Sequence, residues 1–178
     1  MPSELEIRDA RPEDAERIAE INAAGWRTAY VGMIESDRLD AIDIAEWART
    51  IRENLQRLSK GSFSIVAVVD GEIAGSAYVV SPSSDDDLGP EYSELVAIYV
   101  DPGNWRHGIG TALLDAAQAR AARSGSTQMS LWTLTENAPA QAFYEHHGWR
   151  RDGSKEIHPV AKAPAIRMRR PLPPTSSG

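Results

Sequence analysis

The sequence predicts an α/β protein in which a mixed sheet is covered by amphipathic helices. Two runs rich in apolar residues flank Asp70-Gly71, and an Asp-Gly pair in that setting is a strong signal for an antiparallel hairpin. A third strand-like run, 92–100, leads into an alanine-rich segment with helical periodicity, 108–123. The predicted order of elements is β-α-α-β-β-β-α-β-α-β-β, which is typical of a mixed α+β sheet.

The N-terminal part begins with a short strand, because Leu5 and Ile7 alternate with charged residues. A helix is expected to begin at Pro12 and to run through Ala24. Further apolar side chains then follow at roughly helical spacing, namely Trp26, Tyr30, Met33 and Ile34. They form either another turn that faces the core or the wall of a substrate pocket. A longer helix is predicted from Asp37 to Leu58 by its apolar stripe.

The segment Ser81–Glu91 separates the hairpin from the third strand and is polar, with two prolines and three consecutive aspartates, Asp85 to Asp87. This composition predicts a solvated, mobile loop. The aspartates serve either to keep the surface soluble or as a negative lip over a pocket for an amine.

The C-terminal part continues the alternation of strands and helices. The elements predicted after helix 108–123 are a strand at 128–134, a helix at 137–147 with Gly148 as its C-cap, and strands at 149–152 and 165–170 around a loop. Residues 1–172 are expected to form a single domain, and residues 173–178 a disordered tail.

Composition narrows the classes of function. The chain has no cysteine, so disulfides, thiolate metal sites and a cysteine nucleophile are excluded. Its four histidines form no metal-binding pattern, and no metal is expected. A formal charge of −7 argues against nucleic-acid binding. No segment approaches 18 apolar residues, so no membrane span is expected and the predicted location is cytoplasmic.

The turn before helix 108–123 is the strongest functional signal. A helix that opens on glycines offers unpaired backbone N–H groups and the positive end of its dipole, which suit a phosphate. A Walker A loop is excluded because Ile109 stands where its lysine must be. A dinucleotide fingerprint is excluded because Leu113 stands where its third glycine must be.

A different phosphate-binding pattern fits. The run V-x-P-x-x-x-x-x-G-x-G-x-x-L-L, together with the order of elements, resembles the GNAT superfamily of acyl-CoA-dependent N-acyltransferases. The family's pyrophosphate-binding turn, [QR]-x-x-G-x-[GA], corresponds to Trp105–Gly110, where Trp105 replaces the usual Gln or Arg. A second motif, N-x-x-A-x-x-F-Y-x-x-x-G-W at Asn137–Trp149, is similar to the family's N-x-x-A-x-x-[FL]-Y-x-x-x-G-F signature.

The resemblance implies acetyl-CoA as cosubstrate. Its pantetheine arm would pair with backbone groups of Ile98, Tyr99 and Val100. Asn137 would hydrogen-bond the arm near its thiol end. The implied pyrophosphate cradle is made by the N–H groups of Arg106, His107, Gly108, Ile109, Gly110 and Thr111. Arg120 and Arg123 of the same helix either favour the phosphates or form a solvated face.

The resemblance also implies direct attack by a primary amine of a small molecule or peptide in a ternary complex. Glu94 matches the position of a glutamate base in some family members, or else is an ordinary carboxylate at a strand end. Tyr144 matches the family's general-acid tyrosine, or else is a buried tyrosine bonded to backbone. The alternative function is a non-catalytic CoA-binding or regulatory module on the same fold. A homodimer is compatible with the sequence, which does not define the oligomeric state.

Overall fold

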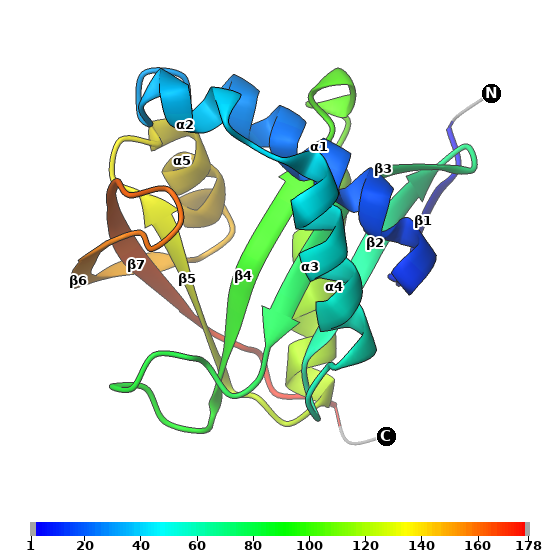
Figure 1. Ribbon diagram of the computed structural model, residues 1–178. Helices are drawn as coiled ribbons and strands as arrows, with labels where there is room; N and C mark the ends of the chain where they lie inside the picture. The colour runs from blue at the N-terminus through cyan, green and yellow to red at the C-terminus, as the bar shows by residue number, and fades with distance from the viewer. Residues whose placement is uncertain (1–2, 177–178) are drawn as a thin grey trace.

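The protein was analysed as a computed structural model that describes residues 3–176. This part of the chain contains one mixed sheet of seven strands, in the order β1-β2-β3-β4-β5-β7-β6 (Figure 1). The strands are β1 (Leu5–Asp9), β2 (Phe63–Val69), β3 (Glu72–Val80), β4 (Tyr92–Val100), β5 (Gln128–Leu134), β6 (Arg150–Ile157) and β7 (Pro164–Pro171). Within residues 3–176, β4 and β5 form the single parallel pair, which confirms the mixed α/β class.

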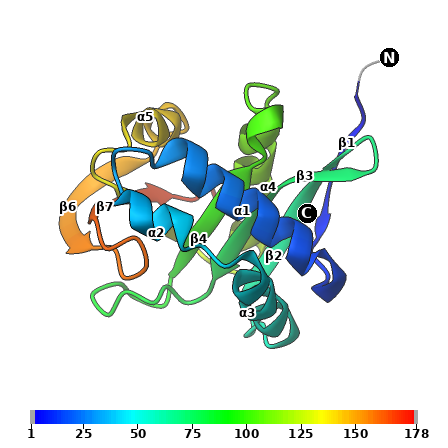
Figure 2. The same cartoon turned by 45° about the horizontal axis from the view of Figure 1, so that its top comes forward.

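Helices cover both faces of this sheet. They are α1 (Ala15–Ala29), α2 (Ser36–Asp40), α3 (Ile44–Gln56), α4 (Ile109–Arg123) and α5 (Ala138–His146), with short 3-10 turns at Pro12–Asp14 and Pro102–Asn104. Helix α1 runs across one face of the sheet with α3 beside it, and α4 lies behind the sheet (Figures 1 and 2). No helix in the described residues is both long enough and apolar enough to span a bilayer.

The hairpin between β2 and β3 forms as its sequence predicts. Asp70 and Gly71 both have positive φ, 50° and 87°. Two successive residues in that conformation make a type I′ turn, whose twist matches the twist of the flanking strands. The β3 strand that leaves this turn pairs with β4 along nearly its whole length, from Gly75 opposite Val100 to Val80 opposite Glu94.

Strands β4 and β5 meet only at one end. They pair over Tyr92–Glu94 and Gln128–Ser130, after which β4 follows β3 and β5 follows β7 (Figure 1). A β-bulge also interrupts β4, since Tyr78 faces Ala97 and Val79 faces Leu95, so that Val96 is the extra residue. Among residues 3–176, no strand therefore lies beside the β4 edge from Leu95 to Val100 on the β5 side.

The main core lies between the sheet and α4. Small and apolar residues of α4, including Leu113, Leu114 and Ala117, are fully buried against the sheet. From β4, Leu95 is buried in this cluster while Ile98 and Val100 pack against it. Trp149 is fully buried here, and its indole N–H donates to Gln118 at 3.1 Å. The alanines that predict the helix thus also let it lie close to the strands.

The prediction of one continuous helix over residues 37–58 is wrong, because two helices, α2 and α3, occupy this segment. The chain leaves α2 after Asp40, and Asp43 adopts an extended conformation. Its side chain then accepts a hydrogen bond from the Glu46 backbone N–H at 3.1 Å. Asp43 and Glu46 have the spacing of an N-cap and its N3 partner, so a start signal was present inside the apolar stripe.

Two further expectations need correction. The strand predicted at 149–152 extends through Ile157, because a bulge at Gly153 (φ 89°) absorbs the glycine and pairing resumes at Lys155. The loop 81–91 is solvated as predicted, with Ser84, Asp86 and Asp87 exposed, but it is also anchored, through contacts described below. Residues 173–176 carry no regular secondary structure, and residues 177 and 178 of the predicted tail lie outside the described residues.

Candidate active site

The turn between β4 and α4 has an unusual backbone. Arg106 and Gly108 both adopt left-handed conformations, with φ of 68° and 77°. A left-handed arginine costs conformational energy, and such residues cluster at ligand-binding turns. The Asp101 side chain accepts from the Gly103 amide at 3.1 Å, while His107 Nδ1 lies 3.2 Å from the Asn104 carbonyl oxygen. These contacts hold the turn in an exposed loop at the end of β4.

Helix α4 begins with free amide groups. The first helical hydrogen bond runs from the Ala112 amide to the Gly108 carbonyl at 3.0 Å. The amides of Ile109, Gly110 and Thr111 therefore have no acceptor within the helix. Together with the helix dipole, they make this end of α4 electropositive. The arrangement suits a phosphate group.

Trp105 is not a simple substitute for Gln or Arg. Its indole N–H folds back and donates to the Val100 carbonyl oxygen at 2.8 Å. The Asp101 amide bonds to Ala74 on the β3 side, so by strand alternation the Val100 carbonyl points to the open edge. Trp105 thus connects the turn to the β4 edge that, by the family resemblance, would pair with pantetheine.

Asn137 starts helix α5 at the upper end of β5. Its side-chain oxygen accepts from the Ala140 amide at 3.3 Å, the geometry of an N-cap. Its side-chain NH₂ has no acceptor in the described part of the chain. Asn137 therefore caps the helix and keeps a donor for a ligand.

Three phenols gather where α1, β4 and α5 approach one another. The Tyr99 hydroxyl accepts from the Trp26 indole at 2.8 Å and lies 3.3 Å from the Tyr30 hydroxyl. Burial, and then the neighbouring Tyr30, raise the pKa of Tyr144 above the usual range. In the described residues the Tyr144 hydroxyl has no hydrogen-bond partner. Tyr144 therefore carries a protonated, uncommitted phenol.

Glu94 lies at the base of the divergence between β4 and β5. It is the last β4 residue that pairs with β5, opposite Ser130, and it is only 7% exposed. Burial raises the pKa of its carboxyl, and Asp85 and Glu156 add to the shift, while a hydrogen bond from Ser84 at 2.8 Å opposes it. Glu94 is therefore buried and, within the described residues, forms no salt bridge, unlike the surface carboxylate that the sequence left as an alternative.

An aromatic group packs together at the C-terminal end of α1. Trp26 packs edge-on against Tyr30 and Trp47, with ring centroids 5.2 Å apart in both pairs. Trp26 also helps to line a pocket of about 200 Å³ with Ile34 and Val160. The segment that follows Ala24 is thus packed against the core, as the first interpretation predicts, and it also lines a pocket. That this pocket takes a substrate stays a prediction.

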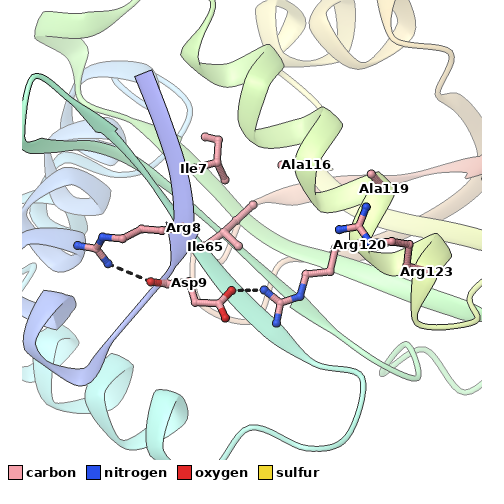
Figure 3. Close-up of a pocket in the computed structure, with 8 residues that line it drawn as sticks. All are labelled: Ile7, Arg8, Asp9, Ile65, Ala116, Ala119, Arg120 and Arg123. Atoms are coloured by element: carbon pink, nitrogen blue, oxygen red, sulfur yellow. Dashed lines mark hydrogen bonds and ion pairs between the residues drawn. The ribbon is translucent and has the colours of Figure 1, made fainter. Parts of the chain in front are cut away.

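A second groove lies on the far side of the molecule and is not part of this site. It measures about 440 Å³ and lies between β1 and α4 (Figure 3). Arg120 forms an ion pair with Asp9 across it, and Arg8 is paired with Asp14. Arg120 and Arg123 lie at the C-terminal end of α4, opposite the glycine turn, so a phosphate role for them at that turn is wrong.

A family model described as "Acetyltransferase (GNAT) family" matches residues 17–149. The chain belongs to this family. "Probable N-acetyltransferase Rv2775" of Mycobacterium tuberculosis is 31% identical over 155 residues, which are 85% of this chain and 83% of that protein. "Uncharacterized N-acetyltransferase YuaI" of Bacillus subtilis is 30% identical, over 78% of this chain and 76% of that protein. As a GNAT protein the chain is an acyltransferase enzyme of the N-acetyltransferase type.

Solved GNAT structures share the fold. PaiA N-acetyltransferase of Thermoplasma acidophilum, in complex with coenzyme A, superimposes with a TM-score of 0.73 at 18% identity, over 94% of this chain and 99% of that one. YncA of Salmonella typhimurium, with acetyl-CoA, gives 0.70 at 20% identity, over 97% and 96%. The GNAT fold expected from the two motifs is therefore confirmed.

The structure of this GNAT protein places the predicted residues around the point where β4 and β5 stop pairing. Ile98, Tyr99 and Val100 form the free part of β4, and residues 106–111 form the turn and helix start above it. Tyr144 lies near Tyr99, whereas Glu94 lies nearer the start of β4, where β4 still pairs with β5. In the part of the chain described, no group of three or more metal-ligating side chains comes together.

Sequence reasoning missed three residues of this region. Gly25 lets α1 approach β4, because a Cβ there would lie 3.0 Å from the Tyr99 ring. Ser84 holds Glu94, and Arg167 anchors the loop that carries Ser84. Gly25 is the one glycine of α1 and gave only a weak signal. No local pattern links Arg167 to loop 81–91, since Arg167 and Asp87 are 80 residues apart.

Proposed function

We propose that this enzyme transfers an acetyl group from acetyl-CoA to a primary amine of a small molecule or peptide, by direct attack in a ternary complex. The observation that carries the proposal is the unpaired β4 edge. It runs from Glu94 at its base to the free amides of α4 at its upper end. Solved GNAT relatives with coenzyme A and acetyl-CoA support this choice of cosubstrate.

The residues present fit acetyl-CoA. The amides of residues 106–111 are proposed to bind the pyrophosphate, where the left-handed turn and helix start leave them free. Backbone groups of Ile98 to Val100 would pair with pantetheine as an added strand, and the Asn137 NH₂ would donate to it. When bound, acetyl-CoA supplies an acetyl group activated as a thioester, which the amine nitrogen attacks so that a C–N bond replaces the C–S bond.

Glu94 is the proposed general base. An alkylamine is protonated at neutral pH, with a pKa of about 10, so a proton must leave its nitrogen. Burial raises the pKa of Glu94 and makes its carboxylate a better proton acceptor than an exposed glutamate. Glu94 then releases the proton that it accepted from the amine to solvent before the next turnover. The bulge at Val96, just beyond Glu94, gives β4 an unpaired N–H that would polarise the acyl carbonyl.

Tyr144 is the proposed donor to the leaving sulfur. Because its pKa is raised, the phenol keeps its proton throughout the neutral range and is available as a hydrogen donor. No protein group competes for that hydrogen in the described residues. The ammonium form of the amine loses two protons before it is an amide. One passes to Glu94 and then to solvent, and the second replaces, through solvent, the proton that Tyr144 gives to the sulfur.

The acceptor is proposed to be cationic and partly apolar. Burial and then Asp85 raise the pKa of both Glu94 and Glu156, so these three carboxylates lie close together. The aromatic wall of Trp26, Tyr30 and Trp47 faces the same side of the sheet. A cytoplasmic location, a homodimer, and a single catalytic domain over residues 1–172 are further proposals, which cell fractionation, light scattering and truncation would test.

The experiment is release of free thiol from acetyl-CoA in a panel of amines, with wild type and Glu94→Gln. Wild type should acylate at least one amine. Glu94→Gln should be slowed most near neutral pH, where the wild-type carboxylate is ionised and the amine is still protonated, and the loss should shrink at lower pH as Glu94 becomes protonated. If coenzyme A binds but no amine is acylated, the non-catalytic CoA-binding module is the better reading. An equal loss at every pH would remove Glu94 as the base.

A further inference from the structure

Arg167 is a buried cation surrounded by carboxylates. It lies on β7 and its side chain is 4% exposed. Its Nε donates to Asp152 at 2.6 Å, and its Nη1 and Nη2 donate to the two oxygens of Asp87 at 2.7 and 2.6 Å. The Asp85 carboxylate lies 3.3 Å from Nη1. The guanidinium therefore joins β6, β7 and the loop 81–91 in one ion-pair network.

This network holds the loop over the sheet. Asp85 also accepts the Trp132 indole N–H at 3.1 Å, and the Arg167 guanidinium lies 5.6 Å from the centre of that ring. Only a planar, forked cation can satisfy Asp87 in a bidentate manner while also bonding Asp152. A lysine at this position would keep the charge and lose most of these bonds.

The residue next to Asp85 connects the loop to the proposed base. The Ser84 hydroxyl donates to the Glu94 carboxylate, at 2.8 Å to one oxygen and 3.2 Å to the other. Ser84 is exposed, and its hydroxyl and its backbone N–H both hydrogen-bond the Glu94 carboxylate. Its place over Glu94 is held from two sides, by Ser83, whose amide donates to the Tyr92 carbonyl at 2.8 Å, and by the contacts of Asp85 and Asp87 with Arg167.

We propose that Arg167 is a positioning residue for Glu94, acting by fixing loop 81–91 so that Ser84 remains bonded to the Glu94 carboxylate. This inference rests on the proposed function, because it takes Glu94 as the base. Arg167 need not touch either substrate. It acts on the hydrogen bonding of the Glu94 carboxylate, which is the group proposed to contact the amine.

The other charged groups around Glu94 are accounted for. From the loop comes Asp85, from β6 comes Glu156, and from β3 comes Tyr78, whose pKa is raised by burial and by Glu94. Within the described residues, Ser84 provides the side-chain hydrogen bond to Glu94, and this bond favours the ionised form. Loss of the bond should therefore raise the pKa of Glu94.

The test is a double-mutant cycle of Arg167→Met and Glu94→Gln, measured as kcat/KM against pH. Arg167→Met should lower kcat/KM by about 10- to 100-fold, part of the roughly 10²- to 10⁴-fold that a positioned base contributes. Its acidic limb should move to higher pH, as should that of Ser84→Ala. In the Glu94→Gln background, Arg167→Met should lower kcat/KM by less than about twofold, because the carboxylate through which Arg167 acts is already absent.

Two outcomes overturn the inference. One is an equal loss in both backgrounds, which is the result of a general structural defect. The other is an acidic limb in Arg167→Met at or below the wild-type pH. If Glu94→Gln instead has wild-type activity, the base assignment in the proposed function fails, whatever Arg167 does. The two failures are therefore distinguishable.

Two further variants guard against loss of folding. Removing Arg167 leaves the buried Asp152 carboxylate without this cation, so Asp87→Ala provides a gentler break, because the Asp87 side chain is 64% exposed. It should shift the acidic limb in the same direction by a smaller amount, and an unshifted limb counts against the inference.

Arg169→Met is the matched control. Arg169 lies on the same strand and also contacts Asp152, at 2.9 Å, but it bonds Tyr92 rather than the loop. It should leave the limb unchanged, and an equal shift would make the effect one of charge alone.

Discussion

The two sides of the proposed site are built in different ways. The proposed cosubstrate side, residues 98–111 with Asn137, comes mainly from one continuous stretch and presents backbone amides and carbonyls. The acceptor side, formed by α1, loop 81–91, β6 and β7, assembles side chains from distant parts of the chain. Arg167 and Asp87, which anchor it, are 80 residues apart. Backbone groups follow from a local conformation, whereas a side-chain cluster depends on the register of the whole sheet.

This difference explains why one departure from the motif is tolerable. Trp105 replaces a polar side chain, but the amides beside it are unaffected, and its indole bonds the strand edge instead. A comparable change on the acceptor side, at Arg167, would leave Asp152 buried without its main cation. The comparison therefore predicts that cosubstrate-side variants alter KM for acetyl-CoA, whereas acceptor-side variants alter acceptor kinetics and pH dependence.

The largest effect is expected where the two sides meet. Tyr144→Phe should lower kcat by roughly 10- to 10⁴-fold, the range for loss of a general acid, with little change in KM for acetyl-CoA. Steady-state kinetics with both substrates measures this. Tyr92→Phe, which removes a hydroxyl bonded to Arg169, is the control and should retain its kcat. An unchanged kcat in Tyr144→Phe would remove Tyr144 from the mechanism.

The next effect isolates the glycine turn. Gly108→Ala and Gly125→Ala each place a Cβ in open space at positive φ, at opposite ends of α4. Both should lose about 1–2 kcal/mol of unfolding free energy, from left-handed strain. Only Gly108→Ala should also raise KM for acetyl-CoA, by about tenfold if roughly 1.4 kcal/mol of binding is lost. Equal KM values in the two variants would mean that the phosphate does not approach this turn.

A smaller effect is expected from Trp105→Phe. The ring is kept but the hydrogen bond to the Val100 carbonyl is lost, and a single hydrogen bond contributes about 0.5–1.5 kcal/mol. KM for acetyl-CoA should therefore rise about two- to tenfold with kcat unchanged. A lower KM would show instead that the indole competes with pantetheine for this carbonyl.

The smallest effect concerns stability. The raised pKa of Glu94 means that the folded protein disfavours its ionised form, so the cost is present above the folded-state pKa and absent below the unfolded value. Glu94→Gln should therefore raise Tm at neutral pH, and the gain should shrink as the pH falls toward the ordinary glutamate range. Calorimetry between acidic and neutral pH tests this. A gain that grows at low pH would contradict the sign of the shift.

Most strands and helices follow from local patterns. The Asp70-Gly71 hairpin, the alanine-rich α4 and the Gly148 cap of α5, at φ 87°, form where the sequence predicts them. The errors occur where periodicity hides a local signal. The N-cap Asp43 divides the predicted helix 37–58 within its apolar stripe. The bulge at Gly153 lets the strand predicted at 149–152 continue past that glycine. In both cases a side-chain or backbone detail of one or two residues decides the boundary.

The sequence alone determined the fold class, the family motifs and the glycine turn, because each is encoded by residues near one another along the chain. Only the tertiary structure decided that Glu94 is buried beneath Ser84, that Trp105 binds the β4 edge, and that Arg167 ties the acidic loop to the sheet. The physical reason is that a carboxylate's ionisation depends on the water and charges around it. Those surroundings come from strands and loops that only folding brings together.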